Sequence, residues 1–217
     1  MAKKYQAIET RVHPLTYTVI GLLVVLIAVL IIALRPTAKE NFYNSYLSRT
    51  QDQNFQKKLP MNNNYILIDN LNDSWFGIKK GMYSIGKSDK QLSIIFIGTP
   101  NDEVSVKVVP NVYARLYGTD KTDPKIDQSE LYTNLDNKVK LYYFELPKFK
   151  EDKTLESITK HYDDEDIVLS SFPLVLALYD NEIISHLTFG EEDNFALKMF
   201  NFYNDLLELE SLEGLLN

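Results

Sequence analysis

A stretch near the start of the chain, from Leu15 to Leu34, contains no charged residue and is almost entirely aliphatic from Val19 onward. As a helix rising about 1.5 Å per residue, it is roughly 30 Å long, the thickness of one hydrocarbon core. Because it is apolar on every face, it does not suit a surface helix of a water-soluble domain, which keeps one side polar. The stretch therefore predicts a single transmembrane helix.

The flanks of this stretch indicate its orientation. Lys3, Lys4 and Arg11 precede it, and an excess of basic residues favours the cytoplasmic side. A cleaved signal peptide is the alternative, but its apolar core has about 7–15 residues and ends at a site of small residues. Here the core is longer and Arg35-Pro36 follows. We expect an uncleaved single-pass signal anchor in the cell membrane, with the N-terminus cytoplasmic and the remainder outside.

Composition excludes two classes of function. The 217-residue chain has no cysteine, so disulfides, thiol nucleophiles, cysteine metal ligands and a lipidated cysteine are ruled out. The net charge is −7, and four basic residues against one acidic residue in 1–35 give that segment +3, which leaves −10 beyond it. A domain of that charge lacks the basic surface that nucleic acids require, so we expect no nucleic-acid partner.

The chain divides into four parts. Residues 1–14 form a cytoplasmic N-terminus, 15–34 the transmembrane helix, 35–64 a stalk and linker, and 65–217 an extracytoplasmic domain. The stalk is expected to be helical in residues 37–56, with an aromatic stripe that packs against the domain or against lipid headgroups. Residues 57–64, with Pro60 and three asparagines, are typical of a linker.

Strand and helix patterns alternate through the domain. Apolar runs predict strands in residues 65–68, 91–97, 138–146, 174–179 and 183–189. Helical spacing and capping residues predict helices in residues 73–85, 102–117, 154–162 and 192–210. Residues 118–137 are polar and predict a long loop or insertion. The resulting class is α/β.

The end of the domain carries the most distinctive pattern. Pro173 opens the apolar run 174–179, and a proline, having no N–H, belongs at the first position of a strand. Asp180-Asn181-Glu182 then favours a tight hairpin turn. A return strand, Gly190 and an amphipathic helix follow.

The succession of proline, strand, tight turn, strand, glycine and helix resembles the C-terminal half of the thioredoxin family. The resemblance implies a central sheet flanked by helices and a cis Phe172-Pro173 bond. It also accounts for Pro110 inside a helix, since a kinking proline follows the family's C-x-x-C motif; Asp102-Glu103-Val104-Ser105 stands in that motif's place. The turn departs from the family's usual Asn-Gly, and a generic hairpin followed by a helix is the alternative.

The resemblance also implies a binding surface. The family holds extended polypeptide beside its cis-proline loop, so we expect a shallow groove lined by Thr99, Asp102, Ser105, Phe172 and Pro173. The alternative is that Phe172 is a core residue and Asp102 only caps a helix.

No pattern assembles a catalytic centre. Serine cannot form a mixed disulfide, and a hydrolase built on Asp102 and Ser105 would need His161 or His186 as a positioned base. The acidic run 163–166 lacks the spacing of a calcium loop. We expect no cofactor, no metal and no enzymatic activity.

The sequence thus predicts a membrane-anchored, redox-inactive thioredoxin-like protein. It would act as an interaction or accessory module, with a protein or peptide partner. A structural subunit bound to a membrane complex mainly through its transmembrane helix is the alternative. An oxidoreductase relative or a hydrolase is the least favoured class.

Overall fold

The structure is a computed structural model that describes residues 13–87, 90–119, 130–135, 138–146, 151–162 and 171–216. The expectations for residues 1–12, for the acidic run 163–166 and for most of the predicted insertion at 118–137 lie outside these residues. The chain forms two compact units, Met1–Thr37 and Ala38–Asn217.

The first unit contains one long apolar helix, α1 (Pro14–Ala33). His13 begins it, because its Nδ1 accepts a hydrogen bond from the Leu15 N–H at 3.2 Å. Every residue of the helix is exposed within the chain. Among the described residues, α1 is the one helix whose length and composition suit a membrane span, and a signal sequence has the same character. The helix is therefore compatible with a single transmembrane or signal anchor.

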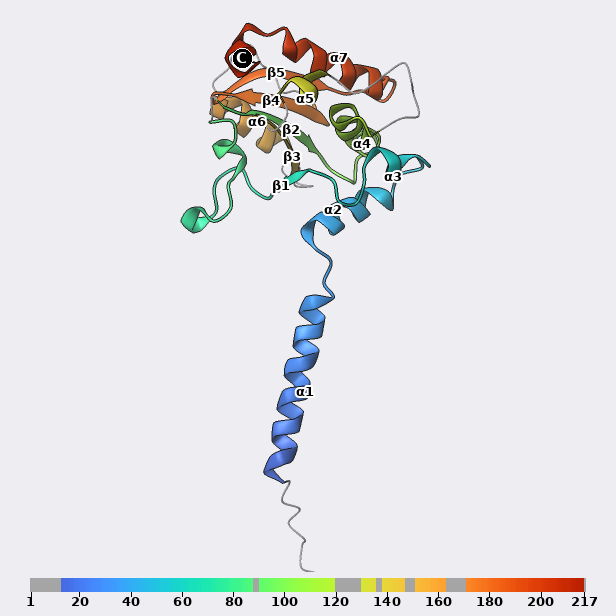
Figure 1. Ribbon diagram of the computed structural model, residues 1–217, viewed down its shortest axis with the longest axis vertical. Coiled ribbons are helices and arrows are strands. Elements are labelled where there is room, and N and C mark those ends of the chain that lie inside the picture. The colour runs from blue at the N-terminus through green and yellow to red at the C-terminus, as the bar shows by residue number, and fades with distance from the viewer. Residues whose placement is uncertain are drawn as a thin grey trace, which may run out of the picture. The chain divides into compact units, whose positions relative to one another are not determined.

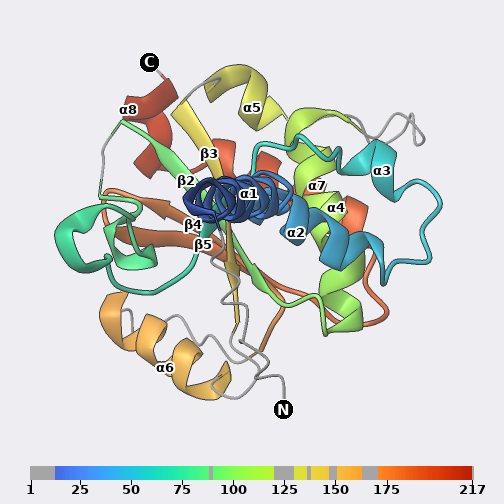
Figure 2. The same ribbon diagram turned by 90° about the horizontal axis from the view of Figure 1, so that it is seen from below.

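The second unit is built on a five-stranded sheet with the order β1-β3-β2-β4-β5 (Figures 1 and 2). Strands β1 (Ile66–Ile68), β2 (Leu92–Gly98) and β3 (Val139–Glu145) run parallel. Strands β4 (Leu174–Tyr179) and β5 (Glu182–Thr188) form an antiparallel hairpin that joins β2. The turn places Asp180 and Asn181 at positive φ, which short polar side chains tolerate. The predicted hairpin is confirmed.

Helices cover both faces of this sheet, so the unit is mixed α/β. One face packs against α2 (Ala38–Leu47), α3 (Phe55–Lys58), α4 (Glu103–Tyr117), α5 (Glu130–Leu135), α7 (Phe195–Leu207) and α8 (Glu213–Leu216). The other packs against α6 (Glu151–Tyr162) and the loop residues Met82 and Ile85. Strand β2 is buried throughout: Ile94 and Phe96 face the first layer, Ile95 and Ile97 the second.

Helix α4 is buried on nearly every side. Asp102 caps its start and Gly118, at φ 66°, ends it. Pro110 lies inside, as predicted, and a proline there removes one helical hydrogen bond. A residue outside the helix stabilises the neighbouring turn, because Tyr65 Oη donates a hydrogen bond to the Val109 carbonyl at 3.1 Å.

The expected stalk belongs largely to the domain. The compact unit begins at Ala38, not at residue 65, because the aromatic stripe of α2 packs against the sheet. Phe42, Tyr43 and Tyr46 are buried, and Tyr46 Oη donates to Tyr143 Oη on β3 at 3.1 Å. Packing against the domain was one of the two expected roles of this stripe.

The predicted helix over residues 73–85 is wrong. Two short 3₁₀ turns, η1 (Trp75–Gly77) and η2 (Met82–Ser84), stand in its place. Phe76 and Gly77 both have positive φ, 73° and 65°, which reverses the chain where a helix would continue. Asp73 accepts the Gly81 N–H at 2.7 Å across the resulting loop and does not cap a helix.

Candidate functional site

The predicted binding residues lie at one end of the sheet, where β2 finishes and β4 starts. Antiparallel pairing ends at Ile97 opposite Leu174, and parallel pairing ends at Gly98 opposite Glu145, so the chain leaves the sheet at Thr99, where Phe172 and Pro173 approach it. The Phe172-Pro173 peptide bond is cis, as predicted. The sheet thus brings the two halves of the predicted site to the same end.

Two of the predicted residues point inward. Thr99 is 4% exposed and Ser105 is fully buried. The Ser105 Oγ accepts a hydrogen bond from the Thr99 N–H at 3.3 Å, which ties the end of β2 to the first turn of α4. Gly98 leaves room for this contact, since a Cβ there would lie 2.8 Å from Ser105 Oγ. The Ser105 hydroxyl and the Thr99 backbone N–H stabilise this junction.

Asp102 and Phe172 keep exposed area beside that junction. The Asp102 carboxylate accepts the Ser105 N–H at 2.6 Å and so caps α4. Phe172 is half-buried and packs against the cluster that contains Leu174 and Leu176. Pro173 is buried. Asp102 thus caps a helix and Phe172 is partly in the core, as the alternative to a binding groove held. The groove itself stays a prediction.

The geometry separates Ser105 from His161, one of the two histidines considered for a hypothetical hydrolase. Ser105 lies in the first turn of α4 on one face of the sheet, whereas His161 lies on α6 on the other. The His161 ring stacks on Tyr83 at 3.7 Å, and burial, reinforced by the positive charge of Lys87, lowers its pKa. His161 is therefore not placed to accept a proton from Ser105.

Metal ligands do not gather in the described part of the chain. Within those residues, no group of three or more His, Cys, Asp or Glu side chains is placed to hold a metal ion.

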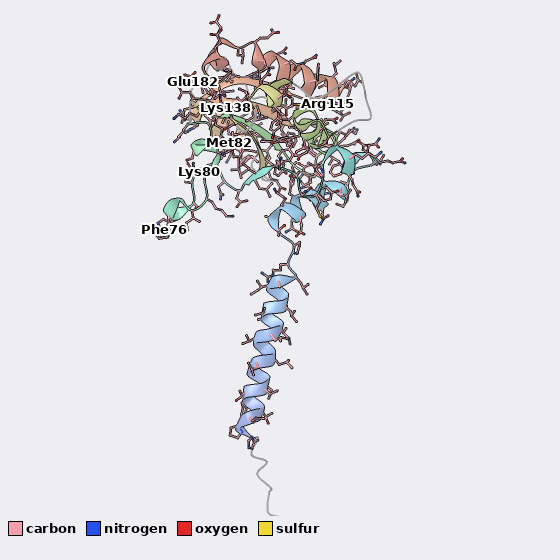
Figure 3. All side chains as sticks on the ribbon, viewed as in Figure 1. Phe76, Lys80, Met82, Arg115, Lys138 and Glu182 are labelled. Atoms are coloured by element: carbon pink, nitrogen blue, oxygen red, sulfur yellow. The ribbon has the colours of Figure 1, made fainter. Side chains whose placement is uncertain are left out.

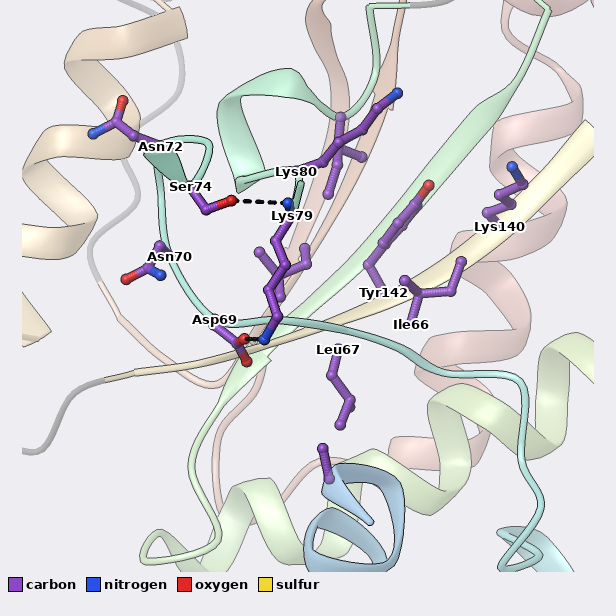
Figure 4. Close-up of a pocket in the computed structure, with 13 residues that line it drawn as sticks. Ile66, Leu67, Asp69, Asn70, Asn72, Ser74, Lys79, Lys80, Lys140 and Tyr142 are labelled. Atoms are coloured by element: carbon purple, nitrogen blue, oxygen red, sulfur yellow. Dashed lines mark hydrogen bonds and ion pairs between the residues drawn. The ribbon is translucent and has the colours of Figure 1, made fainter. Parts of the chain in front are cut away.

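The sequence did not anticipate the cavity beside the edge strand β1 (Figure 4). It has a volume of about 380 Å³ and is bordered by Ile66 of β1, by Lys140 and Tyr142 of β3 and by the loop that carries Lys79 and Lys80. Lys79 pairs with Asp69, and the Lys79 N–H donates to Ser74 Oγ at 2.8 Å. The cavity depends on the loop that residues 73–81 form, and sequence patterns assigned that loop to a helix.

A second hollow, of about 600 Å³, lies beside the same strand and reaches Pro100 and Asn101. Phe42, Tyr143 and Glu145 also line it. Burial raises the pKa of Glu145, and the nearby Arg49 opposes that rise. Because Pro100 and Asn101 follow Thr99 directly, this hollow adjoins the end of the sheet where the groove was predicted. No signal in the sequence marked it, since its walls come from segments far apart in the chain.

In the comparisons with known proteins, no protein-family model matches this chain, and no curated protein matches its sequence.

Proposed function

We propose that the protein is a membrane-anchored, redox-inactive interaction module of thioredoxin-like topology that holds extended polypeptide at the outer face of the membrane. The proposal for the fold is supported by the sheet order β1-β3-β2-β4-β5 with its antiparallel final pair. The cis-Pro173 before β4 and Pro110 within α4 add to that support.

The observation that carries the proposal is the chemistry at the start of α4, beside the sheet end that Pro173 approaches. Asp102 and Ser105 occupy this place in a chain without cysteine. Their polar atoms serve a helix cap and a backbone contact. A mixed disulfide cannot form there, which favours a binding role over a redox role for this end of the sheet. We expect the purified protein to reduce insulin disulfides no faster than background.

The ligand class follows from the backbone and the hollows. Phe172 offers a half-buried apolar ring next to the cis bond, and extended peptides bind through backbone hydrogen bonds combined with apolar contacts to alternate side chains. The hollow at Pro100 and Asn101 gives a bound chain space to continue towards the edge strand β1. Extended polypeptide is therefore favoured over a compact small molecule.

Membrane anchoring is the second part of the proposal. Helix α1 is apolar and exposed on all sides, and the basic residues before it favour a cytoplasmic N-terminus. Protease added to intact cells should remove the domain beyond residue 40. Complete protection of the domain would contradict this orientation.

The site is tested by photo-crosslinking in the full-length protein. A photoreactive phenylalanine analogue at position 172 should capture a partner, whereas the same analogue at Leu197, an exposed position on α7, should not. Asp102→Lys should reduce capture at position 172. Equal capture at both positions would refute the groove.

The alternative is a structural subunit held in a complex mainly through α1. It is favoured by the uninterrupted apolar surface of that helix. Replacing residues 14–33 with an unrelated transmembrane sequence distinguishes the two: partner capture at position 172 persists if the domain binds and disappears if α1 does.

A further inference from the structure

The loop of residues 73–81 presents an apolar tip to solvent. Trp75, Phe76 and Ile78 are 86%, 83% and 83% exposed. The centroids of the Trp75 and Phe76 rings lie 5.4 Å apart and their planes are parallel within 2°, so the stacked rings form one contiguous apolar surface. Figure 3 shows Phe76 at the end of the projecting loop and Lys80 nearer the body of the domain. Three adjacent apolar side chains with such exposure are unusual for a water-facing loop and indicate a contact surface.

Backbone hydrogen bonds hold this tip outward. The Gly77 N–H donates to the Ser74 carbonyl at 2.8 Å, and the Ser74 N–H donates to the Lys79 carbonyl at 2.9 Å. At the base, the Met82 N–H donates to the Asn70 carbonyl at 3.0 Å, and the Met82 side chain is fully buried. The loop is thus an ordered projection whose apolar residues point away from the core.

The loop shares one side of the domain with the point where the chain arrives from α1. Ala38, the first residue of the compact unit, borders the same cavity as Ser74, Lys79 and Lys80. Only the four residues 34–37 separate Ala38 from the last residue of α1. Fully extended, that connection spans about 18 Å. If α1 lies in a bilayer, as the proposed function holds, this side of the domain cannot move far from the lipid surface.

The chemistry of the loop suits a lipid interface. Tryptophan is enriched at the depth of lipid headgroups, and lysines beside an apolar segment extend their ammonium groups to that depth. Lys79 and Lys80 follow the tip directly and are exposed. Lys79 pairs with Asp69, so Lys80 is the lysine placed to reach the headgroups, and the Asp73 carboxylate accepts the Gly81 N–H within the loop.

We propose that Trp75, Phe76 and Ile78 insert into the interface of the bilayer that holds α1 and so dock the domain on the lipid surface. This inference rests on the membrane anchoring in the proposed function but is independent of the peptide groove. It assigns a partner, the lipid surface, to the largest exposed aromatic pair in the described part of the chain.

Trp75 is the only tryptophan of the chain, so its fluorescence reports on the loop alone. Full-length protein is reconstituted into nanodiscs of phosphatidylcholine and phosphatidylglycerol, with or without bromine on the acyl chains. Brominated lipid should quench Trp75, and aqueous iodide should quench it weakly. The control is Trp75→Phe combined with Leu197→Trp, which moves the probe to α7. That probe should show the reverse pattern.

A second variant tests cooperation within the tip. Phe76→Ser keeps the probe and removes one ring of the stacked pair, so it should decrease the equilibrium constant for docking at least about tenfold. Leu197→Ser, which removes an exposed apolar side chain elsewhere, should leave that constant unchanged.

The outcomes separate this inference from the proposed function. Protein that fails to enter nanodiscs refutes the anchoring. Incorporated protein whose Trp75 is quenched by iodide as freely as the Leu197→Trp probe refutes lipid docking and leaves the anchoring intact. Shielding that appears only in native membranes, and not in pure lipid, assigns the tip to a protein partner and overturns the proposal.

Discussion

Two groups of aromatic residues in this protein meet opposite surroundings. Phe42 and Tyr46 of α2 pack with Tyr65 and Tyr143 against the sheet, at ring separations between 4.5 and 6.4 Å. Trp75 and Phe76 stack on each other and are exposed. The difference lies in what surrounds each group, because the residue types are alike.

The polar atoms of the buried group have hydrogen-bond partners within the protein, whereas the exposed group does not need them. Tyr46 Oη donates to Tyr143 Oη, which in turn donates to the Gly98 carbonyl at 3.5 Å. A tyrosine hydroxyl removed from water requires such partners. Phe76 has no polar atom to satisfy, and the Trp75 indole N–H lies in solvent. The buried group therefore determines stability, whereas the exposed group is available for contacts outside the domain.

The largest effect is expected from alkaline pH, which should destabilise the folded state through the buried group. Burial raises the pKa of Tyr46, Tyr65 and Tyr143 above the ordinary value of 10.0. Below pH 10 both states keep the hydroxyl protons, so stability does not change through them. Above pH 10 the unfolded state loses these protons and is favoured, which costs roughly 4 kcal/mol per pH unit for three tyrosines.

This dependence is measured by urea unfolding of the full chain in mild detergent, followed by circular dichroism between pH 8 and about pH 11. The loss of stability should begin near pH 10. A constant midpoint across this range would mean that the hydroxyls ionise without unfolding.

Removing one buried ring should cost nearly as much. Phe42→Ala deletes contacts with three tyrosine rings and leaves a cavity, so we expect a loss of about 3–5 kcal/mol of unfolding free energy. The matched control is Phe76→Ala in the exposed loop, which should change stability by less than about 0.5 kcal/mol. Equal losses of stability at the two positions would contradict the conclusion that the buried group, and not the exposed one, determines stability.

Substitutions at the base of the exposed loop should lower stability, whereas substitutions at its tip should not. A Cβ on Gly81 would lie 2.2 Å from the backbone carbonyl carbon of Asn72. Gly81→Ala therefore forces apart the two chain segments that meet at the base of the loop. We expect a loss of about 1–3 kcal/mol in thermal unfolding. Gly214→Ala, where no atom lies within 4 Å, serves as control and should be neutral or slightly stabilising.

The smallest expected effect concerns one hydroxyl. Tyr46→Phe keeps the ring and removes the donor to Tyr143, so stability should fall by about 1 kcal/mol. Tyr143 keeps its own bond to the Gly98 carbonyl, which limits the loss. A decrease as large as that of Phe42→Ala would show that the hydrogen-bond network, more than ring packing, holds α2 on the sheet.

Much of the fold could be predicted from local patterns. The buried runs of β2 and β3, the cap at Asp102, Pro110 within α4 and the hairpin turn at Asp180 and Asn181 all lie within a few residues of expectation. Each depends on neighbours in sequence, either through periodicity or through the backbone preference of one residue type.

The errors have non-local causes. Asp73-Ser74 resembles a helix start, but Asp73 instead bonds the Gly81 N–H across a loop whose base is buried at Met82. The end of the stalk at residue 64 failed as a boundary because the partners of α2 lie about 100 residues away on β3. In the candidate site, the sequence placed Thr99 and Ser105 near Phe172 and Pro173 without revealing that their side chains point inward.

The sequence alone determined that the chain has one helix too apolar for water, that thiol chemistry is closed to it, and that an apolar hairpin follows Pro173. These properties hold for the residues themselves and need no knowledge of distant contacts. The tertiary structure decided which aromatic residues are buried and which face solvent, because burial requires a partner surface and only the folded sheet supplies one. It likewise left Trp75 and Phe76 facing outward, since no apolar surface in the described part of the chain covers them.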